Sequence, residues 1–223
     1  MYTAASTHPS VSVDISSTLI CPHPSAYSVC KRGLDIIGSL VGLFILALIF
    51  VPVSVAIRIE SPGPIFYSQK RHGLQGQAFR IWKFRSMVQN ADELKGLVEN
   101  EVQGQFFKSE QDPRITRVGN FLRRTSLDEF PQFWNVLKGD MSLVGTRPPT
   151  SDEVARYESH HWERLKVKPG LTGQWQVSGR SSIKDFEEVV KLDLHYQKVW
   201  TPLYDVLLIF KTVQNILIRS DAY

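Results

Sequence analysis

The chain has 223 residues, enough for one domain with a hydrophobic core and an appended membrane element. Lysine and arginine total 26 against 22 for aspartate and glutamate, and this basic balance admits nucleic acid, anionic lipid or phosphorylated metabolites as partners. Nucleic acid is disfavoured as a partner because no zinc-ligand spacing, basic helix or aromatic RNA-binding strand occurs. The only two cysteines, Cys21 and Cys30, exclude a disulfide framework and favour a reducing cytoplasmic setting.

Residues 1–30 are rich in serine, threonine, proline and alanine and carry almost no charge. They lack the positively charged start and short apolar core of a secretory signal. We therefore expect a disordered tail over 1–30.

The range 36–57 contains no charged residue and is the main apolar feature of the chain. As a straight helix it would be about 33 Å long, enough to cross a bilayer core of roughly 30 Å. Pro52 predicts a kink, because proline removes a hydrogen bond and clashes with the preceding turn. Hydropathy favours a spanning anchor, but a helix bent at Pro52 could also enter and leave on one face. Periodicity does not choose between these two.

Turn chemistry at 61–64 ends this helix. Two β-prone runs follow, over 65–69 and 78–84, and the second alternates apolar and polar side chains as a half-buried strand does. The glycine-containing segment 71–76 lies between them. The pattern therefore predicts a β-hairpin.

Further helices are predicted over 86–100, 151–166 and 184–198, with a loop over 101–113. The apolar range 203–218 carries Asp205, Lys211 and Gln214, so it is either a core helix or a helix in the membrane interface, with core as the default. Together with the hairpin, these elements predict a mainly helical α+β fold.

The adjacent carboxylates Asp128 and Glu129 carry the strongest chemical signal. They fall at a predicted helix start, where Ser126 and Glu129 fit a capping box. Most carboxylates in a first turn only stabilise the helix dipole. The same position, with arginines on both sides, would also keep Asp128 ionised and able to attack a phosphorus atom to give an acyl phosphate. Both interpretations stay open at this point.

Weaker signals surround this motif. The segment 166–180 places Lys168 among glycines, where it could face a phosphate, but the spacing matches no P-loop or dinucleotide fingerprint. Basic residues near the hairpin are expected to contact anionic lipid headgroups: Lys70, Arg71 and Arg85. Histidines at 160, 161 and 195 have no metal-like spacing and are expected to be structural.

Six short motifs occur in order along the chain: Lys31-Arg-Gly-Leu-Asp35, Trp82-Lys-Phe-Arg-Ser-Met87, Arg124-Thr-Ser-Leu-Asp-Glu129, Asn135-Val-Leu-Lys-Gly-Asp-Met-Ser-Leu-Val-Gly145, Lys168-Pro-Gly-Leu-Thr-Gly173 and Gln176-Val-Ser-Gly-Arg180. Together they resemble the bacterial sugar transferases that act as monotopic phosphoglycosyl transferases. The resemblance runs from about Lys31 to Ile218. We expect the compact, catalytic-core form, since the multi-helix membrane region of larger members has no counterpart here.

The resemblance implies transfer of a sugar 1-phosphate from a UDP-sugar to polyprenyl (undecaprenyl) phosphate, with release of UMP, as the first membrane step of exopolysaccharide or glycoconjugate assembly. It implies Mg²⁺ as cofactor. It makes Asp128 the nucleophile, which carries the phosphosugar and lies by the metal, and makes Glu129 its acid/base or metal-site partner. The phosphate-binding residues would be Lys83, Arg124, Arg147 and Arg180. Asp193 and Asp205 match recurrent acidic positions of less certain role.

The resemblance also implies that the apolar helix, 31–60, is re-entrant and broken at Pro52. Both helix ends and a catalytic domain over 61–223 would then lie at the cytoplasmic face of the inner membrane, as in a monotopic protein. The expected partners are the donor, the acceptor and membrane lipids. Downstream glycosyltransferases are further possible partners, and nucleic acid is not an expected partner.

One position departs from the family pattern. Thr146 stands where proline usually precedes Arg147-Pro148, which bears on how rigidly Arg147 is presented. Two other functions remain as alternatives: a non-catalytic membrane scaffold that binds nucleotide sugars or partner enzymes, and a metal-dependent lipid phosphatase or nucleotidase. The sequence does not identify the sugar, the pathway, the prenol length, the oligomeric state or the role of the tail.

Overall fold

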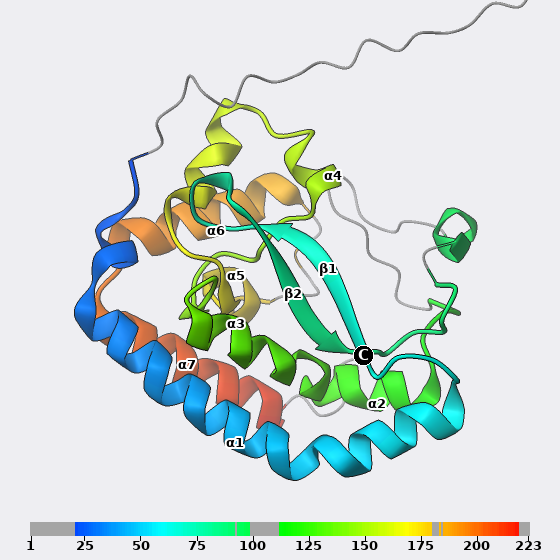
Figure 1. Ribbon diagram of the computed structural model, residues 1–223. Coiled ribbons are helices and arrows are strands. Elements are labelled where there is room, and N and C mark those ends of the chain that lie inside the picture. Colours follow the sequence, from blue (N-terminus) through cyan, green and yellow to red (C-terminus); the bar gives the residue numbers. More distant parts are fainter. Residues whose placement is uncertain (1–20, 92, 99–111, 180–182, 184, 219–223) are drawn as a thin grey trace, which may run out of the picture.

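The computed structural model describes residues 21–91, 93–98, 112–179, 183 and 185–218, which form a mainly helical α+β protein (Figure 1). The α-helices are α1 (Val29–Glu60), α2 (Arg117–Arg124), α3 (Phe133–Lys138), α4 (Ser151–Val154), α5 (Gln174–Val177), α6 (Phe186–Val199) and α7 (Pro202–Ile218). The 3₁₀ helices are η2 (Pro24–Tyr27), η3 (Leu74–Gly76), η4 (Glu93–Leu97), η5 (Leu127–Gln132) and η6 (Ser159–Lys166). The predicted fold class is confirmed at this level.

The strands form two small sheets. β1 (Phe66–His72) and β2 (Ala78–Phe84) pair antiparallel, with Tyr67 opposite Lys83 and Arg71 opposite Phe79, so the predicted hairpin is confirmed. β3 (Ser142–Val144) and β4 (Gly170–Thr172) pair in parallel. These two strands are too short to leave a period-two pattern, and their contact needs glycine. A Cβ on Gly170 would lie 2.1 Å from the Gly145 nitrogen.

Helix α1 is continuous over 32 residues and contains Pro52. By length and composition it could cross a membrane, since its best window has a mean hydropathy of 2.9 and is only 17% buried. Its exposed side chains include Ile37, Phe44 and Leu48. An exposed apolar surface of this extent favours contact with lipid. Figure 1 shows the ribbon of α1 bent rather than straight. Pro52 cannot donate to the carbonyl four residues earlier, which is one established cause of such bends.

Two buried side chains fix the start of α1 to the rest of the protein. The Lys31 ammonium donates to Asp205 of α7 at 2.7 Å. The Asp35 carboxylate accepts hydrogen bonds from the Ser142 hydroxyl and the Leu143 amide of β3, both at 2.8 Å. The first turns of α1 are therefore part of the folded unit, and the remainder of the helix presents its apolar side chains outward.

The apolar interior consists of two clusters. The larger one gathers around the fully buried side chains of Val136, Met141 and Val144, between α3, β2, β3, α6 and α7. The smaller one joins the far end of α1 to the hairpin and α2 through Ile57, Phe84 and Leu122. Each end of α1 thus meets its own packed cluster.

Helix α7 lies beside α1 (Figure 1) and has both a face buried in the core and a face with exposed apolar side chains. Asp205 and Leu208 are buried against the core. Its other large apolar side chains are mostly exposed: Leu203, Val206, Leu207, Phe210, Val213, Ile216, Leu217 and Ile218. One face is therefore a core face, and the other extends the apolar surface of α1.

The tail predicted over 1–30 is wrong for its last part. Residues 24–27 form η2, and α1 already begins at Val29 because the Ser28 hydroxyl accepts a hydrogen bond from the Lys31 amide and caps the helix. Residues 1–20 lie outside the described residues, so the prediction for them stays untested.

Two helix predictions need correction. The range 86–100 is not one helix: Met87 bridges to Ile115 and the Val88 amide donates to the Arg114 carbonyl, so tertiary pairing overrides local propensity and only η4 is helical. The range 151–166 divides into α4 and η6. The helix over 184–198 is confirmed by α6, while the loop over 101–113 falls almost entirely outside the described residues.

Candidate active site

A cavity of about 110 Å³ lies between the hairpin, η5 and the start of α5. Its charged lining residues are Arg71, Lys83, Glu129 and Arg147. Three cations against one carboxylate give the cavity an excess of positive charge. Such a site favours an anionic ligand, and phosphate groups are the anions for which arginine and lysine are best suited.

Lys83 and Glu129 meet across this cavity. Lys83 Nζ lies 2.7 Å from Glu129 Oε1, and the two side chains are 27% and 25% exposed. Lys83 comes from β2 and Glu129 from η5, so the pairing of hairpin and η5 places the ammonium on the acidic motif. The predicted residues Lys83, Glu129 and Arg147 are thus brought together, while their roles stay predictions.

Arg147 is held by a buried carboxylate. Its Nη1 lies 3.1 and 3.2 Å from the two oxygens of Glu153. Glu153 also accepts the Thr150 amide in a capping box at the start of α4. Burial by itself would raise the pKa of Glu153, but Arg147, the Thr150 amide and Arg71 lower it, so the net pKa lies below the usual value. A negatively charged Glu153 therefore keeps the guanidinium of Arg147 in place.

Thr146, which departs from the family pattern, is also fixed. It is 1% exposed, its hydroxyl donates to the Arg164 carbonyl at 3.2 Å, and its backbone bridges to Pro169. The chain before Arg147 is thus held in place without the proline that usually stands there.

Arg71 lines the cavity, while its expected contact with lipid headgroups stays untested. Its Nη1 donates to the Pro148 carbonyl at 2.9 Å, and its Nε and Nη2 donate to Gln69. Burial and the nearby Arg147 lower its pKa to about 10. Strand register could have identified it: residues opposite each other on antiparallel strands share a face, so the face of Lys83 includes its partner Tyr67 and then Gln69 and Arg71.

Asp128 lies one residue before Glu129 in η5, is 7% exposed and is not among the residues that line the cavity. The predicted capping box is wrong, because Ser126 has a left-handed backbone (φ 56°) and its side chain caps nothing. Pro131 lies inside this short helix. The two carboxylates therefore sit on a 3₁₀ turn, in which successive side chains point in different directions.

The two remaining predicted phosphate ligands have different outcomes. Arg124 is exposed at the end of α2 and does not line it. Arg180 lies outside the described residues, so its predicted role is untested.

The segment from β4 to α5 contributes more to the cavity than its weak sequence signal indicated. Gly170, Leu171, Trp175 and Gln176 all line it. The buried Oε1 of Gln176 has no hydrogen-bond partner within the described part of the chain. An unpaired buried acceptor is unfavourable, so this atom is available to a donor or a cation that enters the cavity.

The recurrent acids Asp193 and Asp205 lie in the interior instead. Asp193 pairs with Arg164 at 2.7 Å, with side chains 1% and 3% exposed, and Asp205 pairs with Lys31. Both are members of buried ion pairs away from the cavity lining. Their geometry assigns them to the scaffold.

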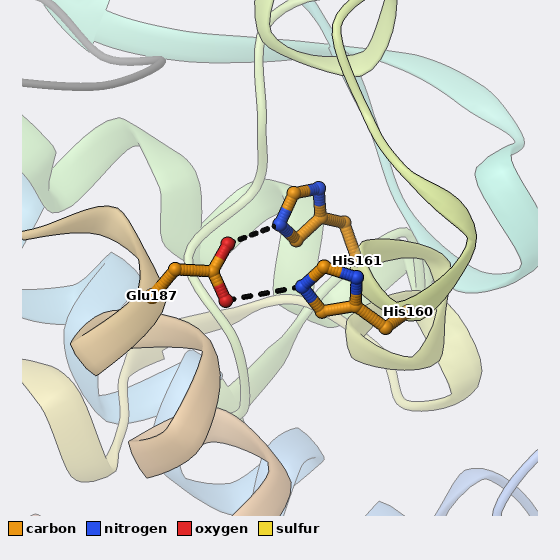
Figure 2. Close-up of side chains that lie close together, drawn as sticks. All are labelled: His160, His161 and Glu187. Atoms are coloured by element: carbon orange, nitrogen blue, oxygen red, sulfur yellow. Dashed lines mark hydrogen bonds and ion pairs between the residues drawn. The ribbon is translucent and has the colours of Figure 1, made fainter.

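A second cluster, His160, His161 and Glu187, brings potential metal ligands within 4.8 Å of one another (Figure 2). The two Glu187 oxygens lie 3.0 Å from His160 Nε2 and 2.7 Å from His161 Nε2. His161 Nδ1 accepts the Glu158 amide, so in the neutral ring Nε2 carries the proton and donates to Glu187. A histidine nitrogen can bind a metal only through a free lone pair, and in this arrangement neither nitrogen of His161 has one. The cluster is therefore a hydrogen-bonded link between η6 and α6.

Comparison with known proteins gives a consistent set of relatives. A family model described as bacterial sugar transferase matches residues 26–219. The galactosyl transferase CpsE of Streptococcus agalactiae serotype III is 48% identical over 199 residues, which cover 88% of this chain and 44% of that protein. The undecaprenyl-phosphate galactose phosphotransferase of Salmonella typhimurium is 45% identical over 199 residues, 86% of this chain and 41% of that protein.

A third relative has a similar length. The exopolysaccharide production protein ExoY of Sinorhizobium fredii is 36% identical over 209 residues, which cover 87% of this chain and 88% of that protein. The chain thus spans less than half the length of the first two relatives and most of the third.

Proposed function

Because the chain belongs to the bacterial sugar transferase family, we propose that it transfers a sugar 1-phosphate from a UDP-sugar to undecaprenyl phosphate and releases UMP. The name of the Salmonella relative supports this acceptor and this type of transferred group. The observation that carries the proposal is the cavity in which Arg71, Lys83 and Arg147 surround Glu129, the neighbour of Asp128. The name of ExoY places such a step in exopolysaccharide production.

We propose two displacements at one phosphorus atom. A carboxylate oxygen of Asp128 attacks the phosphorus that bears the sugar. As the new bond forms, the bond to the bridging oxygen of the diphosphate breaks, and UMP leaves with that oxygen and its electron pair. A phosphate oxygen of undecaprenyl phosphate then attacks the same phosphorus, forms the lipid diphosphate sugar and frees Asp128. The family resemblance is the basis of this assignment, and Asp128 directly precedes Glu129, which lines the cavity.

The cations of the cavity have a clear task in such a reaction. Negative charge develops on the transferred phosphoryl group and on the UMP leaving group, and preorganised cations stabilise it. Lys83 is held by Glu129 and Arg147 by Glu153, so neither has to reorganise during the reaction. Glu129 is also placed to exchange a proton with the reacting groups.

The magnesium ion that the family resemblance implies fits the donors around this cavity. Mg²⁺ prefers oxygen ligands and usually takes one or two carboxylates plus substrate oxygens. Asp128 and Glu129 would hold it, and the unpaired Oε1 of Gln176 is a further oxygen at the cavity. When bound, the ion would neutralise charge on the diphosphate.

The membrane placement belongs to the same proposal. Exposed apolar side chains of α1 and α7 would contact lipid, and a bend at Pro52 would return α1 to the face it entered. The cavity would then lie at the cytoplasmic face of the inner membrane, within reach of a lipid-borne phosphate. Membrane lipids and downstream glycosyltransferases would be its neighbours there.

The substitution Asp128→Asn tests the nucleophile. Detergent-solubilised protein is incubated with magnesium, undecaprenyl phosphate and radiolabelled UDP-sugars, and both UMP and lipid-linked product are measured. We expect both products to fall by at least roughly 10³-fold, because an amide is a very weak nucleophile. The exposed Asp152 of α4 supplies the control Asp152→Asn, which should behave like the unmodified protein.

Each alternative has its own outcome in this assay. Full activity of Asp128→Asn would eliminate the covalent intermediate. Inorganic phosphate released without lipid acceptor would identify a phosphatase, and absence of UMP release across the hexose and N-acetylhexosamine donors would favour the scaffold. The donor that yields most product identifies the sugar.

A further inference from the structure

A second cavity, of about 520 Å³, opens next to the start of α1. It lies between η2, the first turns of α1 and Lys168. Lys168 comes two residues before Gly170, which lines the candidate active site. Lys168 itself therefore lines a different cavity from the one where the sugar donor is proposed to bind.

Lys168 is a half-buried cation without a dedicated counterion. Within the described ranges, its ammonium makes neither a hydrogen bond nor an ion pair. Its Nζ and Arg32 Nη1 both lie under 4 Å from the point where a Cβ on Gly139 would stand, at 3.6 and 3.7 Å, so the two cations are neighbours. Burial lowers the pKa of Lys168, and Arg32 lowers it further. A bound anion would relieve both effects.

The acids near Lys168 are already engaged. Asp35 accepts hydrogen bonds from Ser142 and Leu143, and Asp140 is paired with Lys138 at 3.0 Å. Lys31, the third cation at this cavity, is neutralised by Asp205. Arg32 donates to carbonyls at the end of α3, which leaves its charge without a carboxylate. The cavity thus keeps a local excess of positive charge.

The same cavity has an apolar margin. Tyr27 and Val29 line it and are 72% and 86% exposed, and Ile36 continues this margin along α1. An inorganic ion would use only the cations. A lipid would use both parts, with its phosphate at Lys168 and its acyl chains along the exposed face of α1.

We propose that this cavity binds the phosphate of an anionic phospholipid headgroup, with Lys168 as its main charged contact and Arg32 beside it. The site would fix the depth of the first turns of α1 in the lipid headgroup region. The inference rests on the proposed membrane contact of α1, but not on the proposed reaction.

The substitution Lys168→Gln tests the site by thermal unfolding of the full chain in neutral detergent. The added probes are short-chain phosphatidylglycerol, short-chain phosphatidylcholine and inorganic phosphate. We expect phosphatidylglycerol, at about 100 times its Kd, to raise the midpoint of the unmodified protein by roughly 5–10 °C, because it binds only the folded state. Lys168→Gln should lose this shift. It should be at least as stable without lipid, since it removes an unpaired half-buried charge.

Lys191→Gln is the matched control. It removes the same charge from an exposed position of α6, and Lys191 does not line the cavity. It should keep the full shift with phosphatidylglycerol. An equal shift in Lys168→Gln would overturn the proposal. Equal shifts with phosphatidylcholine or with inorganic phosphate would also overturn it, since the first shows that the net negative charge of the headgroup is not recognised and the second indicates a site for a free ion.

The unfolding assay needs no UDP-sugar, so it separates this proposal from the proposed function. Lipid-dependent stabilisation in a protein that releases no UMP would leave the lipid site standing and remove the transferase. UMP release with no phosphatidylglycerol shift would support the transferase and reject the lipid site.

Discussion

Arg71 carries a charge that is unfavourable where it lies. It is largely buried, and the neighbouring Arg147 adds repulsion, so its pKa falls to about 10. This value still leaves the guanidinium protonated at neutral pH. Glu153 and Glu129 offset part of the charge of the two arginines and Lys83, and an anionic diphosphate would add to this compensation. The clustered cations therefore favour an anionic ligand, but their repulsion lowers the stability of the protein without it.

The substitution Arg71→Met removes this charge while keeping the bulk of the side chain. We expect kcat/KM for the UDP-sugar to fall by roughly 10²-fold, because one preorganised contact to the phosphates is lost. UMP release at several donor concentrations measures the effect.

Arg80→Met is the control for this change. Arg80 is an exposed arginine of the same hairpin, opposite Lys70, and so lies on the other face from Arg71. It should keep normal kinetics. If the two variants were equally active, Arg71 would have no part in donor binding.

Residue chemistry and strand register predict much of this site, but not its details. The alternation in β2 predicts which face Lys83 shares, and counting on through Tyr67 predicts Arg71. The backbone at Ser126 is different: nothing in the residue types indicates a left-handed serine, so a capping box was expected and a 3₁₀ turn is found. The sequence also did not indicate that Asp193 and Asp205 are buried in ion pairs, because their partners come from distant segments.

At the scale of elements, α1 shows which predictions a strong pattern supports. Its apolar run is long enough to predict a helix whether that helix spans the membrane or is re-entrant, and the helix extends to both sides of the run. In contrast, 86–100 has good helix-forming residues, but Met87 and Val88 at its start pair with 114–115, and η4 covers a single short part of its described residues. Elements that depend on tertiary partners are the ones that propensity misses.

Cysteine labelling in cells tests the path of α1. The native Cys30 is exposed in the first turn of α1 and reports on that end. Lys70→Cys, at an exposed position of β1, reports on the other end in a Cys21→Ser, Cys30→Ser background. For a re-entrant helix, an impermeant maleimide added outside should label neither site until the membrane is permeabilised.

The outcome of this experiment is read by comparing the two ends. Labelling of one end alone in intact cells would establish a spanning helix and reject the re-entrant path. Adding Pro52→Ala to both reporters then tests the bend. We expect it to expose one end, since a straight helix of about 33 Å can cross the bilayer core.

At the scale of the whole molecule, buried ion pairs join the beginning of the chain to its end. Lys31 of α1 meets Asp205 of α7 with side chains 5% and 0% exposed, and Tyr196 and Trp200 add hydrogen bonds to the same carboxylate. Such a network sets which elements lie together more than it adds net stability. It explains why α1, α6 and α7 form one unit around β3.

Asp205→Asn breaks this pair and leaves the Lys31 ammonium buried without a counterion. We expect the free energy of unfolding in detergent to fall by about 3–5 kcal/mol. The double change Lys31→Met with Asp205→Leu should recover part of that loss, because no buried charge is left unpaired. A loss below about 1 kcal/mol for Asp205→Asn would show that the pair is not a structural link.

The distance of 174 residues between Lys31 and Asp205 has a consequence for biogenesis. The ribosome releases α1 early, while the carboxylate that neutralises its lysine is made almost last. During synthesis the first turns of α1 cannot form this ion pair before α7 has been made. Final docking of α1 on the folded unit is therefore a late event, and a chain that stops before α7 would leave Lys31 without its counterion.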